Sequence, residues 1–357
     1  MLRSRKRLGI FDALPCYIGG KRRLVGRIFG EINAIIPRRI WPRLVFLDAF
    51  MGGGSVALYA KCQNFGKVIG TDLALRSVTV GQALIANSSV KLSKSDVVRI
   101  LAPYDGPAGK VEQEMVPAVF TKNVGRAIDS ALRIADQTAD MAKSALIRLL
   151  AIRVAMLAHP YGQIRGGTAH RLTTQEYENI TPSATYHYLD ALRLPTVEKM
   201  WALAQAINGG IVQGNGEVFQ TDVLEALPVI PADVMYADPP YANVCSYEKE
   251  YKVLDQILEG LTRPTSAFTK PDGAKQIDRL LERATHVPVV VLSFGNAACT
   301  LEDLEAKMVA AGRSTKAIAI RYLHLPAVAT PQKKEENREF LLIGVDPQSS
   351  LVKGEAA

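Results

Sequence analysis

The sequence predicts an α/β protein in which a doubly wound, mostly parallel sheet is built from both ends of the chain. Two observations lead to this fold class. Residues 43–72 read as strand, glycine turn, helix and strand, the βαβ pattern typical of such sheets. Strand-type runs then become rare and resume only near residue 218, so a mainly helical insertion is expected between the second and third strands.

The first elements follow from local spacing. Apolar residues recur from Leu24 to Ile35 at helical intervals after a Gly-Gly turn, which predicts a helix within residues 17–36, ended by Pro37. The run 43–50 is almost continuously apolar, as expected of a strand buried on both faces. A helix over 56–62 and a strand over 67–72 complete the unit. Further strands are expected at 218–221, 234–237, 287–293, 318–322 and 339–345.

A chain of 357 residues suggests two domains, or one domain with an insertion. The expected division is a discontinuous domain over 1–90 and 206–346, a helical insertion over 91–205, and a disordered tail over 347–357. The high hydrophobic content, 48%, excludes a disordered chain. The longest apolar run, 145–158, carries Arg148 and Arg153 and therefore indicates a buried helix and no membrane span.

Cysteine and histidine spacing indicates no metal site. The four cysteines show no CxxC spacing, which argues against a disulfide framework and a zinc site and favours a reducing cytoplasm. The five histidines have no ligand spacing either.

Positive charge is concentrated at the N-terminus. Residues 1–43 hold eleven Lys and Arg against two acids, whereas the rest of the chain is almost neutral. Such clustering points to a polyanionic partner, because each phosphate neutralised releases counterions. For residues 1–8 a solvated tail explains the charge equally well. Lys21, Arg22 and Arg23 follow the Gly-Gly turn and are the stronger candidates for contacting nucleic acid.

The segment DAFMGGGS, from Asp48 to Ser55, places glycines between a strand and a helix. Such a turn lets a ligand approach the backbone at the helix N-terminus. It matches neither phosphate-binding glycine pattern. Asp72 ends the next strand, where an acid can accept both hydroxyls of a ribose. A nucleoside without a pyrophosphate fits these features, which points to S-adenosylmethionine; a plain tight turn is the alternative.

The segment Asp238-Pro239-Pro240-Tyr241 follows the apolar run VMYA. The exocyclic amine of adenine is a poor nucleophile because its lone pair is delocalised into the ring. Acceptors aimed at its N–H groups free that lone pair, and the Asp238 carboxylate and the Pro239 carbonyl can supply two. Two prolines make the turn rigid, and Tyr241 offers a face on which an extruded base can stack. A rigid structural loop is the alternative.

These motifs, together with YIGGKRRL, resemble those of the Dam-like DNA adenine methyltransferases, over residues 16–90 and about 205–345. The resemblance implies a Rossmann-like sheet with a helical target-recognition insertion, the cofactor S-adenosylmethionine, and transfer of a methyl group to adenine N6. It also implies contacts between the cofactor and the aromatic-x-Gly-Gly-Lys segment, and an aspartate in FQTDVLEAL near the cofactor's adenine. The cofactor-binding residues expected are Tyr17, Gly20, Lys21, Asp48, Phe50, Gly52, Gly54, Ser55, Asp72, Asp222 and Asp238.

The recognised DNA sequence stays open. Cys16 stands where the family often has a lysine that helps to read the target, and the insertion is longer than usual. Within it, the loop 161–173 combines flexible glycines with Arg165, His170 and Arg171, which suits contact with DNA. Gln163 or Arg165 could read base edges, or the loop could touch phosphates alone. By resemblance, Ser293 and Asn296 lie near the target pocket.

The function expected is therefore site-specific adenine-N6 methylation of double-stranded DNA by a cytoplasmic, nucleoid-associated enzyme without a membrane partner. A restriction endonuclease partner is left open. An RNA adenine methyltransferase would use the same DPPY chemistry, although YIGGKRR argues against it. A non-catalytic DNA-binding protein is a third reading, against which the intact Asp238 and glycine turn argue.

Overall fold

The computed structural model describes residues 9–116, 119–158, 195–240, 251–258, 266–270, 272–273, 275–296, 299–322 and 331–351. They fall into two compact units. The helical unit lies within Met1–Cys16, Gln82–Val212 and Glu248–Thr262, and the sheet unit within Tyr17–Gly81, Gln213–Tyr247 and Arg263–Ala357.

The sheet unit contains seven strands in the order β3-β2-β1-β4-β5-β7-β6. The strands are β1 (Val45–Asp48), β2 (Lys67–Asp72), β3 (Gly216–Gln220), β4 (Val234–Ala237), β5 (Val289–Gly295), β6 (Ser314–Arg321) and β7 (Arg338–Val345). Pairing is parallel from β3 to β5, and β7 runs antiparallel to both of its neighbours. The strand order reverses between β1 and β4, so the loops after these two strands leave the same edge side by side.

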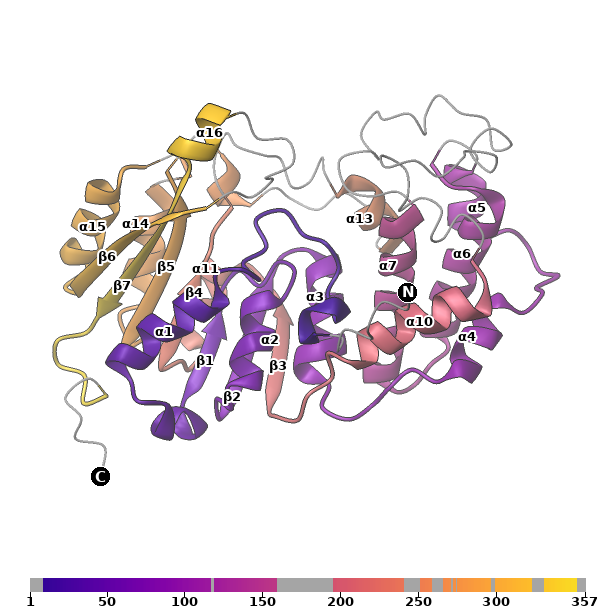
Figure 1. Ribbon diagram of the computed structural model, residues 1–357, viewed down its shortest axis with the longest axis horizontal. Helices are drawn as coiled ribbons and strands as arrows, with labels where there is room; N and C mark the ends of the chain where they lie inside the picture. Colours follow the sequence, from indigo (N-terminus) through magenta and orange to yellow (C-terminus); the bar gives the residue numbers. More distant parts are fainter. Residues whose placement is uncertain are drawn as a thin grey trace, which may run out of the picture. The chain divides into compact units, whose positions relative to one another are not determined.

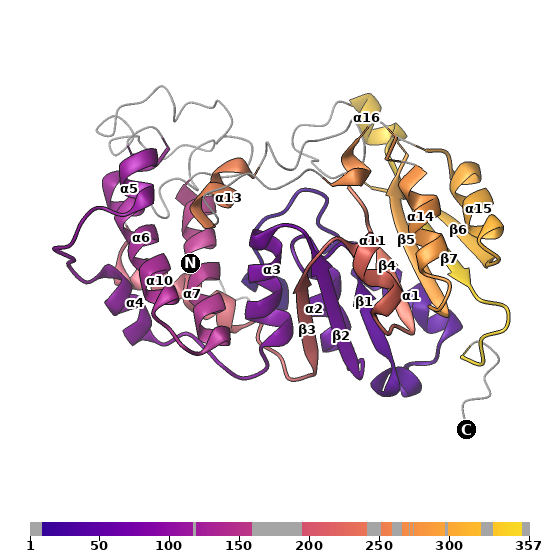
Figure 2. The same ribbon diagram turned by 180° about the vertical axis from the view of Figure 1, so that it is seen from behind.

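Helices cover both faces of this sheet (Figures 1 and 2). One face carries α1 (Val25–Ile35), α2 (Ser55–Cys62) and α3 (Leu75–Gly81); the other carries α11 (Val223–Ala226), α14 (Lys275–Arg283) and α15 (Leu301–Ala310). Successive residues of β1 serve the two faces. Phe46 stacks on Phe29 of α1, with ring centroids 5.4 Å apart, whereas Leu47 joins the apolar cluster beneath α14 and α15.

The helical unit contains α4 (Lys94–Leu101), α5 (Lys110–Met115), α6 (Lys122–Asp136), α7 (Met141–Ala158), α10 (Val197–Asn208) and α13 (Lys252–Leu258). In the described part of 91–205 there is no strand, as expected of the insertion. The apolar run 145–158 lies in α7, where Arg153 donates to the backbone carbonyls of residues 12–14. Among the described residues, no helix is long and apolar enough to span a bilayer.

The unit boundaries differ from the expected 90/91 and 205/206. They lie at 81/82 and 212/213, and the segment before Tyr17 groups with the helices. The segment before Tyr17 groups with the helices through a contact that no local pattern shows: Ala13 is fully buried, and its Cβ lies where a side chain on Gly210 would stand. In the expected tail, residues 347–351 form a turn in which Ser349 is buried and donates to the Asp346 carbonyl.

Several elements begin elsewhere than their sequence pattern predicts. The first helix, Val25–Ile35, begins where the apolar spacing from Leu24 places it. Strand β1 begins only at Val45, because residues 38–43 form a short 3-10 helix that buries Trp41. Edge strand β6 starts four residues before the predicted 318, since its alternating exposure leaves a weak apolar signal. The remaining short elements are η1 (Ile10–Ala13), η2 (Arg38–Arg43), η3 (Gln82–Ala86), η5 (Leu227–Val229), η6 (Ala267–Thr269) and α16 (Pro331–Glu336).

Candidate active site

The glycine turn is tied to the ends of β1 and β2 by its own backbone. Met51 N donates to the Thr71 carbonyl at 3.0 Å, and Gly52 N donates to Asp72 Oδ2 at 2.8 Å. Gly54 takes the left-handed conformation (φ 75°) at the N-cap of α2 and has no side chain to cap the helix. Asp48 supplies the cap instead, since its Oδ2 accepts from Ala57 N at 3.0 Å.

Asp48 is buried, with 1% of its surface exposed. Burial raises the pKa of Asp48 to about 8, although the amide of Ala57 opposes the shift. Asp48 is therefore mostly protonated at neutral pH. The predicted contact with the cofactor stays a prediction, and the bond shown is structural.

Tyr17 lies against the glycine turn. A Cβ on Gly53 would come within 2.7 Å of the Tyr17 Cβ, and one on Gly52 within 3.0 Å of its ring. Gly52 also has a positive φ of 51°. The successive glycines are thus required partly by this packing and not by a ligand alone.

Asp72 holds the turn with both carboxylate oxygens. Oδ2 accepts from Gly52 N, and Oδ1 accepts from Ala74 N at 2.9 Å. Burial raises the pKa of Asp72, while these donors and Arg76 partly offset the shift. The sequence analysis did not identify Arg76, which is 8% exposed. An arginine in a predicted helix is usually exposed, so nothing in the local sequence indicated that this one is buried beside Asp72. The side chain of Ser77 is a further hydrogen-bond partner of Asp72. A carboxylate offers about four acceptor positions, so Asp72 can accept a ligand hydroxyl as well.

Lys21 and Asp238 meet although they are 217 residues apart in the chain, with Nζ and Oδ2 at 2.6 Å. The Lys21 ammonium also donates to the Gly19 carbonyl at 3.0 Å, and its side chain is 2% exposed. Burial alone would lower the pKa of Lys21, but the carboxylates of Asp238 and Glu339 outweigh it and hold the pKa above its ordinary value. The DNA-contacting role predicted for Lys21 is therefore corrected: its charge faces two carboxylates inside the protein.

Glu339 is the second carboxylate on Lys21, and the sequence analysis missed it. Its Oε1 lies 3.2 Å from Lys21 Nζ and accepts from Ser293 Oγ at 2.5 Å. Glu339 is 1% exposed at the start of β7. A glutamate beside the apolar run FLLIGV was the available signal, because a buried acid needs a partner.

Residues 17–149 match the model of the D12 class N6 adenine-specific DNA methyltransferase family. Over these residues the chain is similar to the DNA adenine-N6 methyltransferases. The chain is also 25% identical over 340 residues to the Type II methyltransferase M2.HphI of Haemophilus parahaemolyticus, covering 92% of this chain and 96% of that protein. The rRNA methyltransferase aviRa of Streptomyces viridochromogenes aligns over 95% of this chain and 92% of its own at 12% identity, with a TM-score of 0.36. That likeness is too slight to support an argument about fold or substrate.

The other residues that the sequence predicts for the site make contacts within the protein or lie outside the described residues. Phe50 packs edge-on against Phe268, with centroids 4.9 Å apart, and Asp222 caps α11 through Leu224 N at 2.9 Å. Asn296 is exposed and exchanges hydrogen bonds with the backbone of Arg338, so it fastens the start of β7. Gly20 N donates to the Tyr17 carbonyl, and Ser55 begins α2. Tyr241, Gln163, Arg165, His170 and Arg171 lie outside the described residues.

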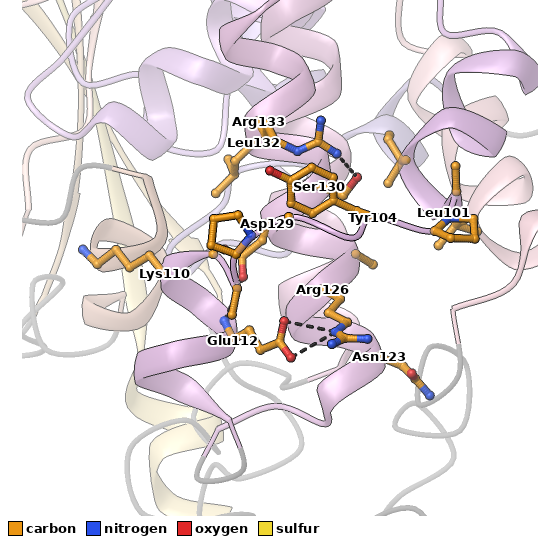
Figure 3. Close-up of a pocket in the computed structure, with 18 of the residues that line it drawn as sticks. Leu101, Tyr104, Lys110, Glu112, Asn123, Arg126, Asp129, Ser130, Leu132 and Arg133 are labelled. Carbon is orange, nitrogen blue, oxygen red and sulfur yellow. Dashed lines mark hydrogen bonds and ion pairs between the residues drawn. The ribbon is translucent and has the colours of Figure 1, made fainter.

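The helical unit contains a separate cavity of about 760 Å³ between the loop 101–110 and α6 (Figure 3). Arg133 covers the Tyr104 ring at 4.0 Å, and Arg126 pairs with Glu112 at 3.0 Å. Acids and bases are mixed in its lining, and none of the predicted site residues lines it. In the described part of the chain, no cluster of three potential metal ligands occurs.

Proposed function

We propose that this DNA adenine methyltransferase polarises the exocyclic amine of a flipped adenine with the Asp238 carboxylate and the Pro239 carbonyl. The observation that carries the proposal is the meeting of three motifs at one sheet edge. The glycine turn follows β1 and Asp238 follows the adjacent β4, where Ala49 N donates to the Tyr236 carbonyl at 2.9 Å. The Gly-Gly-Lys segment reaches the same point through Lys21.

The residues present suit S-adenosylmethionine. The glycine turn lies at the carboxyl edge of the sheet, and Asp72 offers acceptors for ribose hydroxyls. The carboxylates of Asp238 and Glu339 face one ammonium, that of Lys21, and this excess of negative charge suits a cationic ligand. The cofactor, when bound, supplies a methyl group on a sulfonium, which is a good leaving group. The proposed cofactor site includes further residues, some of which hold its shape and do not contact the cofactor. They are Tyr17, Gly20, Lys21, Asp48, Phe50, Gly52, Gly54, Ser55, Asp222 and Asp238.

Asp238 is suited to its role by exposure and rigidity. Its side chain is 17% exposed although its ion-pair partner is buried, so the carboxylate can reach both Lys21 and a ligand. Pro239 is buried and Pro240 half-buried, which keeps the turn from relaxing. The amine loses a proton once it is methylated, and Asp238 is the proposed acceptor. Tyr241 is proposed to stack on the flipped base.

The wider assignment follows from the family. Double-stranded DNA is the proposed partner, with Arg22, Arg23 and the loop bearing Arg165, His170 and Arg171 in contact with it. A cytoplasmic location on the nucleoid would follow from that substrate. Because a relative that aligns over 92% of this chain is a Type II methyltransferase, a restriction endonuclease partner is proposed as well.

Transfer of tritium from labelled S-adenosylmethionine tests the function directly. We expect label to enter duplex DNA in N6-methyladenine, and RNA of the same sequence to remain unlabelled. Sequencing of methylated adenines in DNA from cells that express the chain would then give the recognised sequence. Label in RNA alone would overturn the proposal, and so would binding of DNA without any transfer.

Replacing Asp72 with alanine should weaken binding of S-adenosylmethionine by about 1.5–3 kcal/mol, the scale of hydrogen bonds to a charged group. The variant loses the ribose acceptors and also releases Gly52 and Ala74. Isothermal titration calorimetry measures the change. Glu217→Ala is a suitable control, because it removes an acid from the adjacent strand that pairs with Lys67 at 2.8 Å. Unchanged affinity in a folded Asp72→Ala variant would remove Asp72 from the site.

Replacing Arg22 and Arg23 with alanine should lower the slope of log affinity for DNA against log salt by up to about two units. Both follow Lys21 at the ligand edge of the sheet. The matched control is the double replacement of Arg38 and Arg39, which are exposed but precede β1 at the opposite edge. Equal slopes in the two double variants would mean that Arg22 and Arg23 only solvate the surface.

A further inference from the structure

Glu339 is a buried acid that the proposed chemistry leaves without a task. It is the second residue of β7, and β7 pairs with β5 so that Glu339 lies opposite Gly295. Its Oε1 is shared between the Ser293 hydroxyl and the Lys21 ammonium. Through Lys21 it is coupled to Asp238, while its own side chain is 1% exposed and therefore shielded from solvent.

The charges of this cluster do not cancel. Lys21 contributes one positive charge, and Asp238 and Glu339 contribute two negative ones, so the three groups carry a net charge of −1. Two of the neighbouring groups, Asp48 and Tyr236, add no charge at neutral pH. Burial raises the pKa of Asp48 to about 8, and burial with the nearby carboxylate of Asp238 raises that of Tyr236 far above its ordinary value.

Without Glu339, Asp238 would be the one carboxylate paired with the ammonium among the described residues. A one-to-one ion pair at 2.6 Å would neutralise the carboxylate that must accept hydrogen bonds from the amine. With Glu339 present, the ammonium is divided between two carboxylates. Asp238 then stays in place but keeps part of its charge for the substrate.

We propose that Glu339 is a positioning residue for methyl transfer, which shares Lys21 with Asp238 and so leaves Asp238 part of its negative charge. This inference rests on the proposed function. During transfer the sulfur–methyl bond breaks with its electron pair passing to sulfur, while the N6 lone pair forms the nitrogen–methyl bond. The positive charge thereby moves from the sulfonium to the amine, which then gives a proton to Asp238. Two carboxylates that share one ammonium therefore favour the cationic cofactor over the neutral thioether product.

The test compares the affinity of the protein for S-adenosylmethionine with that for S-adenosylhomocysteine by calorimetry. Glu339→Gln keeps the shape and can still accept from Ser293, but it removes the charge. We expect the ratio of the two affinities to fall roughly tenfold, which corresponds to about 1.4 kcal/mol. Ser293→Ala, which removes the hydrogen bond and keeps the charge, should leave the ratio within about twofold.

Two further variants separate charge from structure. Glu31→Gln removes another buried glutamate that pairs with a lysine, Lys316 at 2.6 Å, and should not change the ratio. Lys21→Met should raise the ratio, and Lys21→Met with Glu339→Gln should return it close to wild type, because one carboxylate then remains. This pair carries the test even if Glu339→Gln alone does not fold.

The outcomes are distinct. An unchanged ratio in Glu339→Gln, or in the double variant relative to Lys21→Met, overturns the role of Glu339 and leaves the proposed function standing. An equal loss of both affinities shows a purely structural role and overturns the inference as well. A wild-type protein that binds neither compound refutes the proposed function itself, and the inference falls with it.

Discussion

Replacing Asp238 with alanine is expected to slow methyl transfer by ~100- to 1000-fold while leaving DNA binding intact, by analogy with the loss of one preorganised hydrogen-bonding group in other active sites. The variant removes the acceptor for the target amine and does not touch the basic surface that would hold DNA. Single-turnover methylation measures the rate, and salt-dependent binding of duplex DNA measures the affinity. Asp238→Asn should lose less, because its amide oxygen still accepts one hydrogen bond.

Asp233→Ala is the matched control for Asp238→Ala. The two aspartates flank β4, but Asp233 lies at the opposite end and its Oδ2 accepts from Val45 N at 2.7 Å. We expect Asp233→Ala to cost stability and to leave the rate of transfer nearly unchanged. If folded Asp238→Ala transfers methyl groups at the wild-type rate, the DPPY segment is a structural turn and the proposed mechanism is wrong.

Replacing Asp48 with asparagine is expected to remove a pH dependence of stability. The pKa of Asp48 is about 8 in the folded protein, whereas an aspartate in an unfolded chain titrates near 4. Between these values the folded state holds a proton that the unfolded state has lost, so stability falls as pH rises. The wild type should therefore lose about 1.4 kcal/mol per pH unit relative to Asp48→Asn. Urea unfolding of both proteins between pH 5 and pH 7 measures the difference.

Asp96→Asn is a useful comparison, because the pKa of Asp96 is shifted the other way. Burial would raise it, but Lys143 at 2.8 Å and Ser93 outweigh burial and lower the pKa. Both states of the protein are then ionised at Asp96 above pH 5, so the effect of Asp96→Asn should not vary between pH 5 and pH 7. A constant difference between wild type and Asp48→Asn over that range would show that Asp48 is ionised in the folded protein.

Much of the candidate site is predictable because parallel strands obey a simple geometric rule. Asp72 ends its apolar strand, and Asp238 directly follows another. The carboxyl ends of neighbouring parallel strands meet at one edge, so finding the strands is enough to group these side chains. Turn chemistry also acts locally, which is why the glycines after β1 and the prolines after β4 are readable without a structure.

The fate of the N-terminal lysine illustrates what local pattern cannot show. Lys21 stands in a cluster of basic residues, and such clusters are usually solvated or bound to polyanions. Its actual partners, Asp238 and Glu339, lie far away in the sequence. Glu339 reaches Lys21 only because β7 pairs antiparallel with β5. No periodicity in residues 17–36 reports on that placement.

By itself, the sequence determined the α/β class and the helical character of the insertion, since each depends on hydrophobic periodicity and turn chemistry within short segments. The motifs of an adenine methyltransferase were found in the sequence through their resemblance to a known family. Only the tertiary structure decided which charges are buried together and where the two units divide. Burial of a charge is set by partners through space, as with Glu339 and Lys21, and the assignment of a segment such as 9–16 to one unit is set by packing against a distant helix. The burial of a charge and the division into units both depend on many contacts between parts of the chain that are far apart in the sequence. The local sequence around each residue does not indicate these contacts.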